Sequence, residues 1–175
     1  MHSSYISRHQ YFTARKDAYE TESGKLVDPY FVVELPASAC AMAVTENNEV
    51  IFVEQYRHPI GRKILELPGG FVERGEDPAR GVARELLEET GYIFNEFVML
   101  GTTAANPGVL NNFTYLFLAT GGVKKTAQAL DHNEEIEIVL KPMEEARQLL
   151  KENKIVQSMH ALCLFYAFEK IDGRR

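Results

Sequence analysis

Residues Gly70–Tyr92, GFVERGEDPARGVARELLEETGY, decide the fold of this 175-residue chain because they predict one well-delimited helix. Asp77 is a good N-cap, Pro78 suits the first helical position, and Gly91 suits the C-terminal stop. Five apolar residues recur at helical spacing and predict the face that packs on the rest of the protein. They are Ala79, Val82, Ala83, Leu86 and Leu87.

Three glutamates, Glu85, Glu88 and Glu89, form an acidic ridge on the same predicted helix. Their spacing of i, i+3 and i+4 places the carboxylates on one face, where like charges repel. Hard cations such as Mg²⁺ prefer oxygen ligands of this kind and complete their shell with water and substrate phosphates. The ridge therefore predicts a metal site, with Arg84 placed to orient Glu88. The alternative is a solvated acidic helix face.

The rest of the chain predicts strands, with two helices at its C-terminal end. Residues 9–36 predict an N-terminal hairpin, and Ala39–Val44 and Val50–Gln55 predict a second hairpin. Together with the helices, these strands predict a layered α/β or α+β domain. Further strands are expected at Glu96–Gly101, Thr114–Leu118 and Ile136–Leu140, a short apolar segment at Ile64–Leu67, a polar loop over 119–134, and helices at Pro142–Lys151 and Gln157–Lys170.

The composition is that of a globular protein, with 45% hydrophobic and 25% charged residues. The net charge of −6 argues against nonspecific binding to nucleic acid or to an anionic membrane surface. The longest apolar run, near Met159–Phe168, is about half the length that crosses a bilayer. Cys40 and Cys163 lie far apart, and the N-terminus has no apolar signal segment. We therefore expect a cytoplasmic protein with reduced, buried thiols and no membrane or nucleic-acid partner.

The spacing of glycines and charged residues in the first segment resembles the Nudix hydrolase signature. That signature reads Gly, five residues, Glu, seven residues, Arg-Glu-aliphatic, one residue, Glu-Glu, one residue, Gly and an apolar residue. The chain fills every position, so it is identified as a member of the Nudix hydrolases. The matching residues are Gly70, Glu76, Arg84, Glu85, Leu86, Glu88, Glu89, Gly91 and Tyr92.

Motifs outside the signature resemble the ADP-ribose and nucleoside-diphosphate-sugar pyrophosphatase branch. They are Glu54–Arg57, Glu66–Gly70 and Pro107, which lies fifteen residues after Tyr92. The usual Ser-Pro-Gly of the branch reads Asn106–Pro107–Gly108, and Val109–Asn112 stand where an acidic residue is often found. These departures bear on the preference for ADP-ribose over other nucleotide sugars.

The resemblance implies roles for residues of the site. Glu85 and Glu89 match the principal metal ligands, with Glu88 nearby and the Gly69 carbonyl as a further ligand, for Mg²⁺ or alternatively Mn²⁺. Arg57 matches an arginine that contacts substrate phosphate; its alternative is a surface pair with Glu54. Glu66 matches a residue near the terminal ribose or a dimer contact. Glu76 and Arg84 match residues that tie the loop to the helix.

The general base of this branch often comes from an acidic loop late in the chain. The stretch 131–137, DHNEEIE, is such a loop, so Glu134 and Glu135 are the candidates, followed by Glu88. A carboxylate there would accept a proton from the attacking water. The alternative is a solvated turn before a strand.

The resemblance also implies the architecture: a Nudix fold of class α/β, with a mixed sheet sandwiched between helices and an N-terminal β-hairpin appendage. Residues 1–36 form the appendage and 37–175 the Nudix domain. In the branch, the appendage exchanges across a homodimer and helps bind the base. Tyr30 and Phe31 are its candidates to stack on adenine, the alternative being core packing.

The expected reaction is metal-dependent hydrolysis of the pyrophosphate bond of ADP-ribose or a related nucleoside diphosphate sugar, giving a nucleoside monophosphate and a sugar phosphate. One alternative is a Nudix hydrolase of another linked nucleoside diphosphate, such as a dinucleoside polyphosphate. A second is a non-catalytic nucleotide sensor. Sensors are expected to lose signature glutamates, and this chain keeps all of them.

Overall fold

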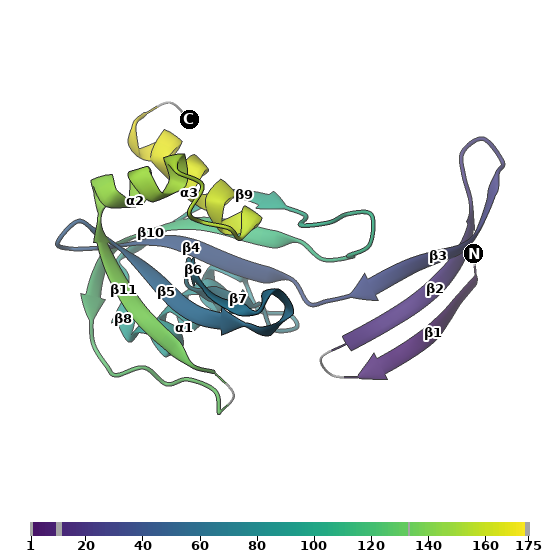
Figure 1. The fold of residues 1–175 in the computed structure, drawn as a ribbon, viewed down its shortest axis with the longest axis horizontal. Coiled ribbons are helices and arrows are strands. Elements are labelled where there is room, and N and C mark those ends of the chain that lie inside the picture. Colours follow the sequence, from purple (N-terminus) through teal and green to yellow (C-terminus); the bar gives the residue numbers. More distant parts are fainter. Residues whose placement is uncertain (1, 10–11, 133, 174–175) are drawn as a thin grey trace.

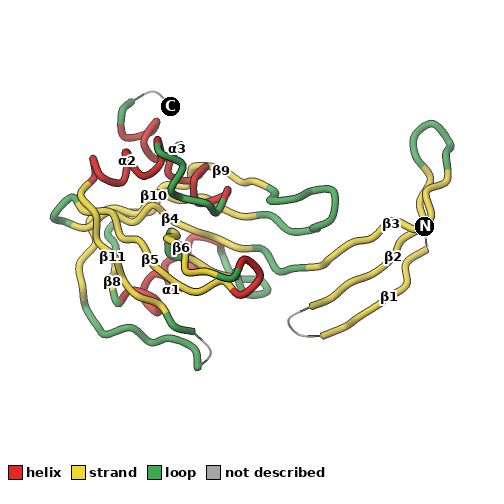
Figure 2. The backbone as a smooth tube through the Cα atoms, viewed as in Figure 1, coloured by secondary structure: helices red, strands yellow, loops and turns green. Residues whose placement is uncertain are grey.

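An eight-stranded mixed sheet forms the body of the computed structural model, which describes residues 2–9, 12–132 and 134–173 (Figures 1 and 2). The main strand order is β11-β5-β4-β10-β8, with β6 paired to β5, β7 to β4 and β9 to β10. The β4 and β10 strands run parallel, and the other pairs are antiparallel. The strands are β4 (Ser38–Thr45), β5 (Glu49–Arg57), β6 (Arg62–Glu66), β7 (Gly69–Phe71), β8 (Tyr92–Ile93), β9 (Glu96–Thr103), β10 (Thr114–Lys124) and β11 (Ile136–Pro142).

Helices cover both faces of this sheet, as the sequence predicted. The helix α1 (Pro78–Thr90) lies on one face, and α2 (Met143–Lys151) and α3 (Ser158–Ile171) lie on the other (Figure 1). Side chains of β4 alternate between the two layers because successive residues of a strand point to opposite faces. Ala39, Ala41 and Ala43 pack in the layer of Val82 and Leu86, whereas Cys40, Met42 and Val44 pack in the layer of Cys163 and Leu164.

The N-terminal segment forms a separate antiparallel sheet of three strands, β1 (His2–His9), β2 (Phe12–Glu20) and β3 (Leu26–Glu34). The predicted hairpin was therefore incomplete, because β1 was missed. Its sequence, HSSYISRH, lacks the apolar alternation that marks a half-buried strand, and most of it is exposed. Figure 1 shows this sheet projecting away from the body of the molecule, at the end of the extended segment that leads into β4.

The loop 106–112 holds the end of β3 against the main sheet. Val33 donates its backbone N–H to Val109 O at 2.8 Å, and the hydroxyl of Tyr30 donates to Gly108 O at 2.7 Å. Asn111 and Asn112 add side-chain hydrogen bonds to the backbone of Leu35 and Pro36, each at 3.0 Å. The two asparagines that stand in place of the branch pattern thus bind the segment between β3 and β4.

The strand β10 is longer than the sequence predicted. The strand predicted at Thr114–Leu118 continues to Lys124, so the polar loop begins at residue 125 rather than 119. Gly121 and Gly122 lie inside this strand beside Asn95 and Phe94, where a larger side chain would clash.

Cys40 and Cys163 are free and buried, as predicted. None of the described helices combines the length and the apolar character that crossing a bilayer requires.

Candidate active site

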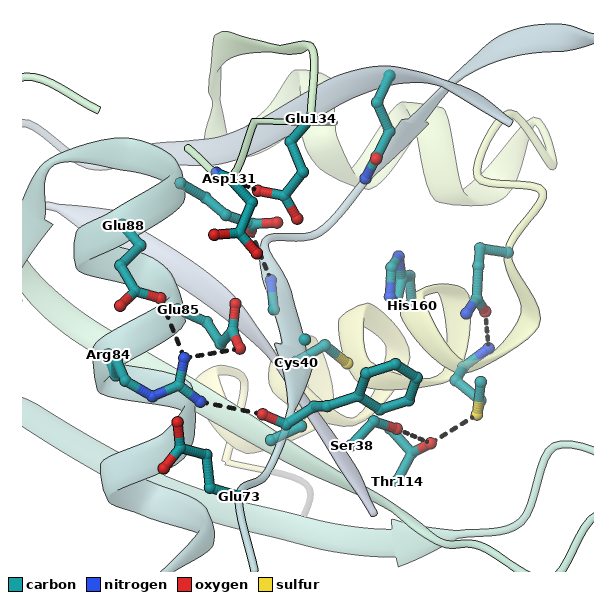
Figure 3. A pocket seen from close by; sticks show the side chains of 18 of the residues that line it. Ser38, Cys40, Glu73, Arg84, Glu85, Glu88, Thr114, Asp131, Glu134 and His160 are labelled. Atoms are coloured by element: carbon teal, nitrogen blue, oxygen red, sulfur yellow. Dashed lines mark hydrogen bonds and ion pairs between the residues drawn. The ribbon is translucent and has the colours of Figure 1, made fainter. Parts of the chain in front are cut away.

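A cavity of about 530 Å³ opens where four segments meet: α1, β7, the start of α3 and the loop 125–135 between β10 and β11, here called the late loop (Figure 3). Figure 3 shows its two ends: carboxylates of α1 and the late loop on one side, and Ser38, Thr114 and His160 on the other. Six acidic residues line the cavity. They are Glu73, Glu85, Glu88, Glu89, Asp131 and Glu134.

The helix α1 has the predicted caps, which place its glutamates at the cavity. The carboxylate of Asp77 accepts hydrogen bonds from the N–H groups of Ala79 and Arg80, and Pro78 occupies the first turn. Gly91 ends the helix in the left-handed conformation at φ 72°. Val82 and Leu86 are fully buried on the sheet side. Leu87, expected in the same apolar stripe, is half-exposed instead.

Arg84 holds the acidic ridge together. Its Nη1 atom donates to Glu85 at 2.9 Å and to Glu88 at 3.0 Å, while Nε donates to Glu76 at 3.2 Å. Its Nη2 atom donates to Phe71 O, which ties the loop before the helix to the helix itself. The hydrogen bond from Arg84 lowers the pKa of Glu76. One guanidinium therefore orients two of the predicted metal ligands and the signature glutamate of the loop.

Burial sets the electrostatics of the other carboxylates. Glu89 is 5% exposed and accepts the Gly69 N–H at 2.8 Å, yet loss of hydration raises its pKa to about 8. Burial likewise raises the pKa of Glu85, with a smaller rise from the charges of Glu88 and Glu134. A Cβ atom at Gly70 would lie 2.6 Å from the Glu85 carboxylate. The glycine at this signature position therefore leaves space for that carboxylate.

These oxygen donors fit a divalent cation. Carboxylates that are costly to ionise alone become favourable ligands when a cation neutralises them. The side chains of Glu85 and Glu88 turn toward Arg84, and that of Glu89 turns toward the Gly69 N–H. Within the described ranges, no three acidic, histidine or cysteine side chains converge closely enough to hold an ion in this arrangement. To hold a cation together, Glu85, Glu88 and Glu89 would turn from these partners toward the cavity.

Arg57 lies in the cavity wall, held by a buried carboxylate. Its Nη2 and Nε atoms lie 2.7 and 3.0 Å from Glu66 Oε2, and Gln55 donates to the same oxygen at 2.9 Å. Glu66 is 1% exposed, behind Arg57. The expected alternative, a pair between Arg57 and Glu54, is not the one formed, because Glu54 lies 3.9 Å from Lys63 instead. Glu66 therefore does not line the cavity itself, but it fixes the position of Arg57, which does.

The late loop brings one of its two predicted carboxylates to the cavity. Glu134 lines it, and its Oε2 atom accepts the Asp131 N–H at 3.2 Å. Glu135 is not among the lining residues. The next acidic residue, Glu137, binds the Lys63 ammonium at 3.0 Å instead.

The two predicted aromatic residues lie outside this cavity. Tyr30 packs edge-on against Tyr19 at 5.6 Å between ring centroids and binds the loop 106–112 through its hydroxyl. Phe31 is 56% exposed on the N-terminal sheet, so the alternative of core packing does not hold for it. Within one chain, neither ring reaches the acidic end of the cavity.

Several cavity residues were missed from the sequence. His160, on α3, is 9% exposed, and its Nδ1 atom accepts the Leu67 N–H at 3.2 Å. Ser38 and Thr114 share a hydrogen bond of 2.8 Å at the neutral end, where Gln157 and Met159 also line the cavity. No local pattern marks these positions, because each is an ordinary polar or apolar residue at the start of its strand or helix.

Comparison with known proteins gives a consistent result. Residues 34–162 match the NUDIX domain family. The chain is 36% identical over 136 residues to the methanol dehydrogenase activator of Bacillus methanolicus, covering 77% of this chain and 74% of that protein. It is 30% identical over 159 residues to the ADP-ribose pyrophosphatase of Bacillus subtilis, covering 82% of this chain and 86% of that protein.

A solved structure described as an ADP compounds hydrolase superposes with a TM-score of 0.84 at 19% identity, covering 100% of this chain and 95% of that one. This likeness shows that the fold extends over the N-terminal sheet as well as the main sheet. The intact signature on α1, the mixed sheet between helices and the family match agree. The chain belongs to the NUDIX domain family of hydrolases.

Proposed function

We propose that this protein hydrolyses the pyrophosphate bond of ADP-ribose or a related nucleoside diphosphate sugar, giving a nucleoside monophosphate and a sugar phosphate. The observation that carries the proposal is that Glu85, Glu88 and Glu89 line the same cavity as Arg57. The names of relatives support the substrate class, since ADP-ribose pyrophosphatases of Bacillus subtilis and Mycobacterium tuberculosis are 30% and 31% identical to this chain.

The chain's own residues bind and orient the diphosphate. Glu85, Glu88 and Glu89, with the Gly69 carbonyl, would hold Mg²⁺ or alternatively Mn²⁺, which would supply positive charge for the diphosphate and activation of the attacking water. Arg57 adds a fixed guanidinium for a phosphate oxygen, because Glu66 holds its side chain from behind. The neutral end with Ser38 and Thr114 receives an uncharged part of the substrate.

Glu134 is the proposed general base. As the water oxygen bonds to phosphorus, Glu134 accepts the proton and the P–O bond to the departing phosphate breaks with its electron pair. Glu134 suits this role because it lines the cavity without a cationic partner among the described residues, whereas Glu85 and Glu88 are bound to Arg84. Glu135 and Glu88 are the remaining candidates.

We also propose a homodimer in which the N-terminal sheet of one chain packs on its partner. Large apolar side chains of this sheet are exposed in the single chain. They are Tyr5, Ile6, Phe12, Leu26 and Phe31. A partner would cover them and could receive Tyr30 and Phe31 beside its own cavity. Light scattering should show twice the 19.8 kDa chain mass; an active monomer at micromolar concentration would refute this.

The free, buried cysteines support a reducing compartment, the cytoplasm.

A substrate panel tests the reaction. ADP-ribose, other nucleotide sugars and dinucleoside polyphosphates should be incubated with the protein and Mg²⁺, and the products separated by chromatography. The proposal requires AMP and ribose phosphate from ADP-ribose at a higher kcat/KM than for dinucleoside polyphosphates. Turnover of the latter alone would support the alternative Nudix substrate, and nucleotide binding without turnover would support a sensor.

Activation of a dehydrogenase is a second candidate function, since the 36% identical relative from Bacillus methanolicus is named for it. The test is to add this protein to methanol dehydrogenase and to measure the initial rate. A Glu89→Gln variant in parallel shows whether any stimulation depends on hydrolysis. An unchanged rate with both proteins would remove this candidate.

A further inference from the structure

We propose that Gln128 is a positioning residue that fixes the late loop over the cavity by binding it to the end of α1. This inference rests on the proposed function, because the loop carries Glu134. It concerns a residue that does not line the cavity and that contacts the acidic ridge only at the backbone carbonyl of Glu89. The argument comes from the hydrogen bonds that end α1.

The last carbonyl groups of a helix have no partner within the helix. In this protein the segment that begins at Lys124 supplies most of the missing donors. Ala129 N–H donates to Glu88 O at 2.8 Å, and the Lys124 ammonium donates to Thr90 O at 3.2 Å. The N–H groups of Lys125 and Thr126 donate to Gly91 O at 2.9 and 3.2 Å. The start of the late loop is thus the C-terminal cap of the helix that carries the acidic ridge.

Gln128 supplies the one side-chain amide in this cap. Its Nε2 atom donates to Glu89 O at 2.7 Å and to Ile136 O at 3.1 Å. Glu89 belongs to α1, and Ile136 is the first residue of β11. Gln128 is half-buried, although Lys125, Thr126, Ala127 and Ala129 around it are all exposed. A single amide therefore joins the start of the loop, the metal-binding helix and the strand at the end of the loop.

This arrangement restrains the residues between the two anchor points. Asp131 and Glu134 lie in that stretch, line the cavity and bind each other through the Asp131 N–H. Without the Gln128 amide, Glu89 O and Ile136 O lose the hydrogen bond that it donates. Among the described residues after Thr126, only the Ala129 N–H then still binds the loop to α1. A displacement of about 1 Å at a catalytic group can reduce turnover by about a hundredfold. Gln128 therefore affects catalysis through the position of Glu134.

The test compares Gln128→Met with a matched control, Thr126→Val. Methionine keeps the length of the side chain and is neutral, but it cannot donate a hydrogen bond. Thr126 lies in the same loop, and within the described part of the chain its hydroxyl donates only to the neighbouring Ala127 O. We expect Gln128→Met to lower kcat for ADP-ribose by about 10- to 100-fold, with KM and the Mg²⁺ requirement within about twofold of wild type. Thr126→Val should retain wild-type kcat.

A double-mutant cycle separates positioning from general destabilisation. If Gln128 acts through Glu134, adding Gln128→Met to Glu134→Gln should cause almost no further loss of kcat. Equal losses in both backgrounds, or wild-type kcat in folded Gln128→Met, would overturn the inference. Wild-type kcat in Glu134→Gln would overturn it as well, while leaving the hydrolytic function intact.

A measurement independent of turnover distinguishes this failure from failure of the proposed function. Hydrogen exchange at Ala129 and at residues 131–135 should speed up in Gln128→Met and not in Thr126→Val. Unchanged exchange would contradict the positioning role even if the substrate proves to be different.

Discussion

Arg57 and Glu66 form an ion pair with an Nη2–Oε2 distance of 2.7 Å, in which the carboxylate is buried and the guanidinium reaches the cavity. Gln55 supplies a second side-chain donor to the same oxygen. A buried carboxylate is tolerated when donors surround it, and here the donors also immobilise the arginine. The pair converts a flexible side chain into a fixed part of the cavity wall.

The first prediction concerns this pair. Glu66→Gln should raise KM for the nucleotide sugar by about tenfold, because Arg57 loses its charged partner, while kcat at saturation changes less. Arg57→Ala should raise KM further and lower the free energy of unfolding by about 1–3 kcal/mol, because Glu66 stays buried with one donor fewer. The matched control is Glu54→Gln, which removes an exposed carboxylate from the same strand. An equal effect of Glu54→Gln on KM would contradict the assignment.

The second prediction concerns the acidic ridge. Glu89→Gln should lower turnover by at least about a hundredfold at saturating Mg²⁺, because a ligand carboxylate is lost while the side-chain shape is kept. Glu152→Gln, an exposed change at the C-terminal end of α2 that does not line the cavity, serves as the control. Folded Glu89→Gln protein with near wild-type turnover would rule out the assignment.

The same variant has an expected effect on stability without metal. The pKa of Glu89 is raised to about 8 in the folded protein, so its carboxylate opposes folding increasingly as pH rises from about 4.5 to 8. In chelator, Glu89→Gln should therefore unfold at a higher temperature than wild type at pH 8, and the difference should shrink toward pH 5. A lower melting temperature at pH 8 would contradict this.

The third prediction separates the two late-loop glutamates. Glu134→Gln should lower kcat by about 10²- to 10⁴-fold with little change in substrate or Mg²⁺ affinity, because Glu134 lines the cavity. Glu135→Gln is the matched control and should stay near wild type, since Glu135 does not line the cavity. If both single variants and the double variant turn over normally, the base lies elsewhere and Glu88 is the next residue to test.

The fourth prediction is a pH dependence of stability due to His160. Burial lowers the pKa of His160 to about 3, well below its value of about 6.5 in the unfolded chain. As pH falls, the unfolded state therefore binds a proton at this histidine before the folded state does. The free energy of unfolding then falls by up to roughly 1.4 kcal/mol per pH unit between pH 6.5 and 3. His160→Asn keeps a hydrogen-bond acceptor but does not titrate. Denaturant midpoints from pH 7 to 4 should fall more steeply for wild type; parallel curves would contradict the prediction.

The fifth prediction concerns the attachment of the N-terminal sheet. Asn111→Ala removes the acceptor of the Leu35 N–H, so hydrogen exchange at Leu35 should increase and unfolding should become easier by about 1 kcal/mol. Asn47→Ala, in the exposed turn between β4 and β5, is the control and should leave exchange at Leu35 unchanged. Unaltered exchange in Asn111→Ala would show that the backbone hydrogen bonds of the loop suffice.

Local chemistry made α1 and its acidic ridge predictable from the sequence. Caps at Asp77 and Gly91 act within one turn of the helix ends, and the spacing of the glutamates fixes which face they share. The strands with clear apolar alternation were predictable for the same reason. The polar strand β1 and the continuation of β10 to Lys124 were not, because their pairing partners, and not their own composition, keep them extended.

The sequence by itself determined the helix, the order of most strands and the identity of the acidic ridge, because these depend on residues only a few positions apart. The tertiary structure alone decided that Arg57 binds Glu66, that Glu134 rather than Glu135 reaches the cavity, and that Gln128 caps α1. Leu67 and His160 form a hydrogen bond across 93 residues of chain. Contacts of this kind leave no local pattern, because the packing of the sheet between its helices brings their residues together.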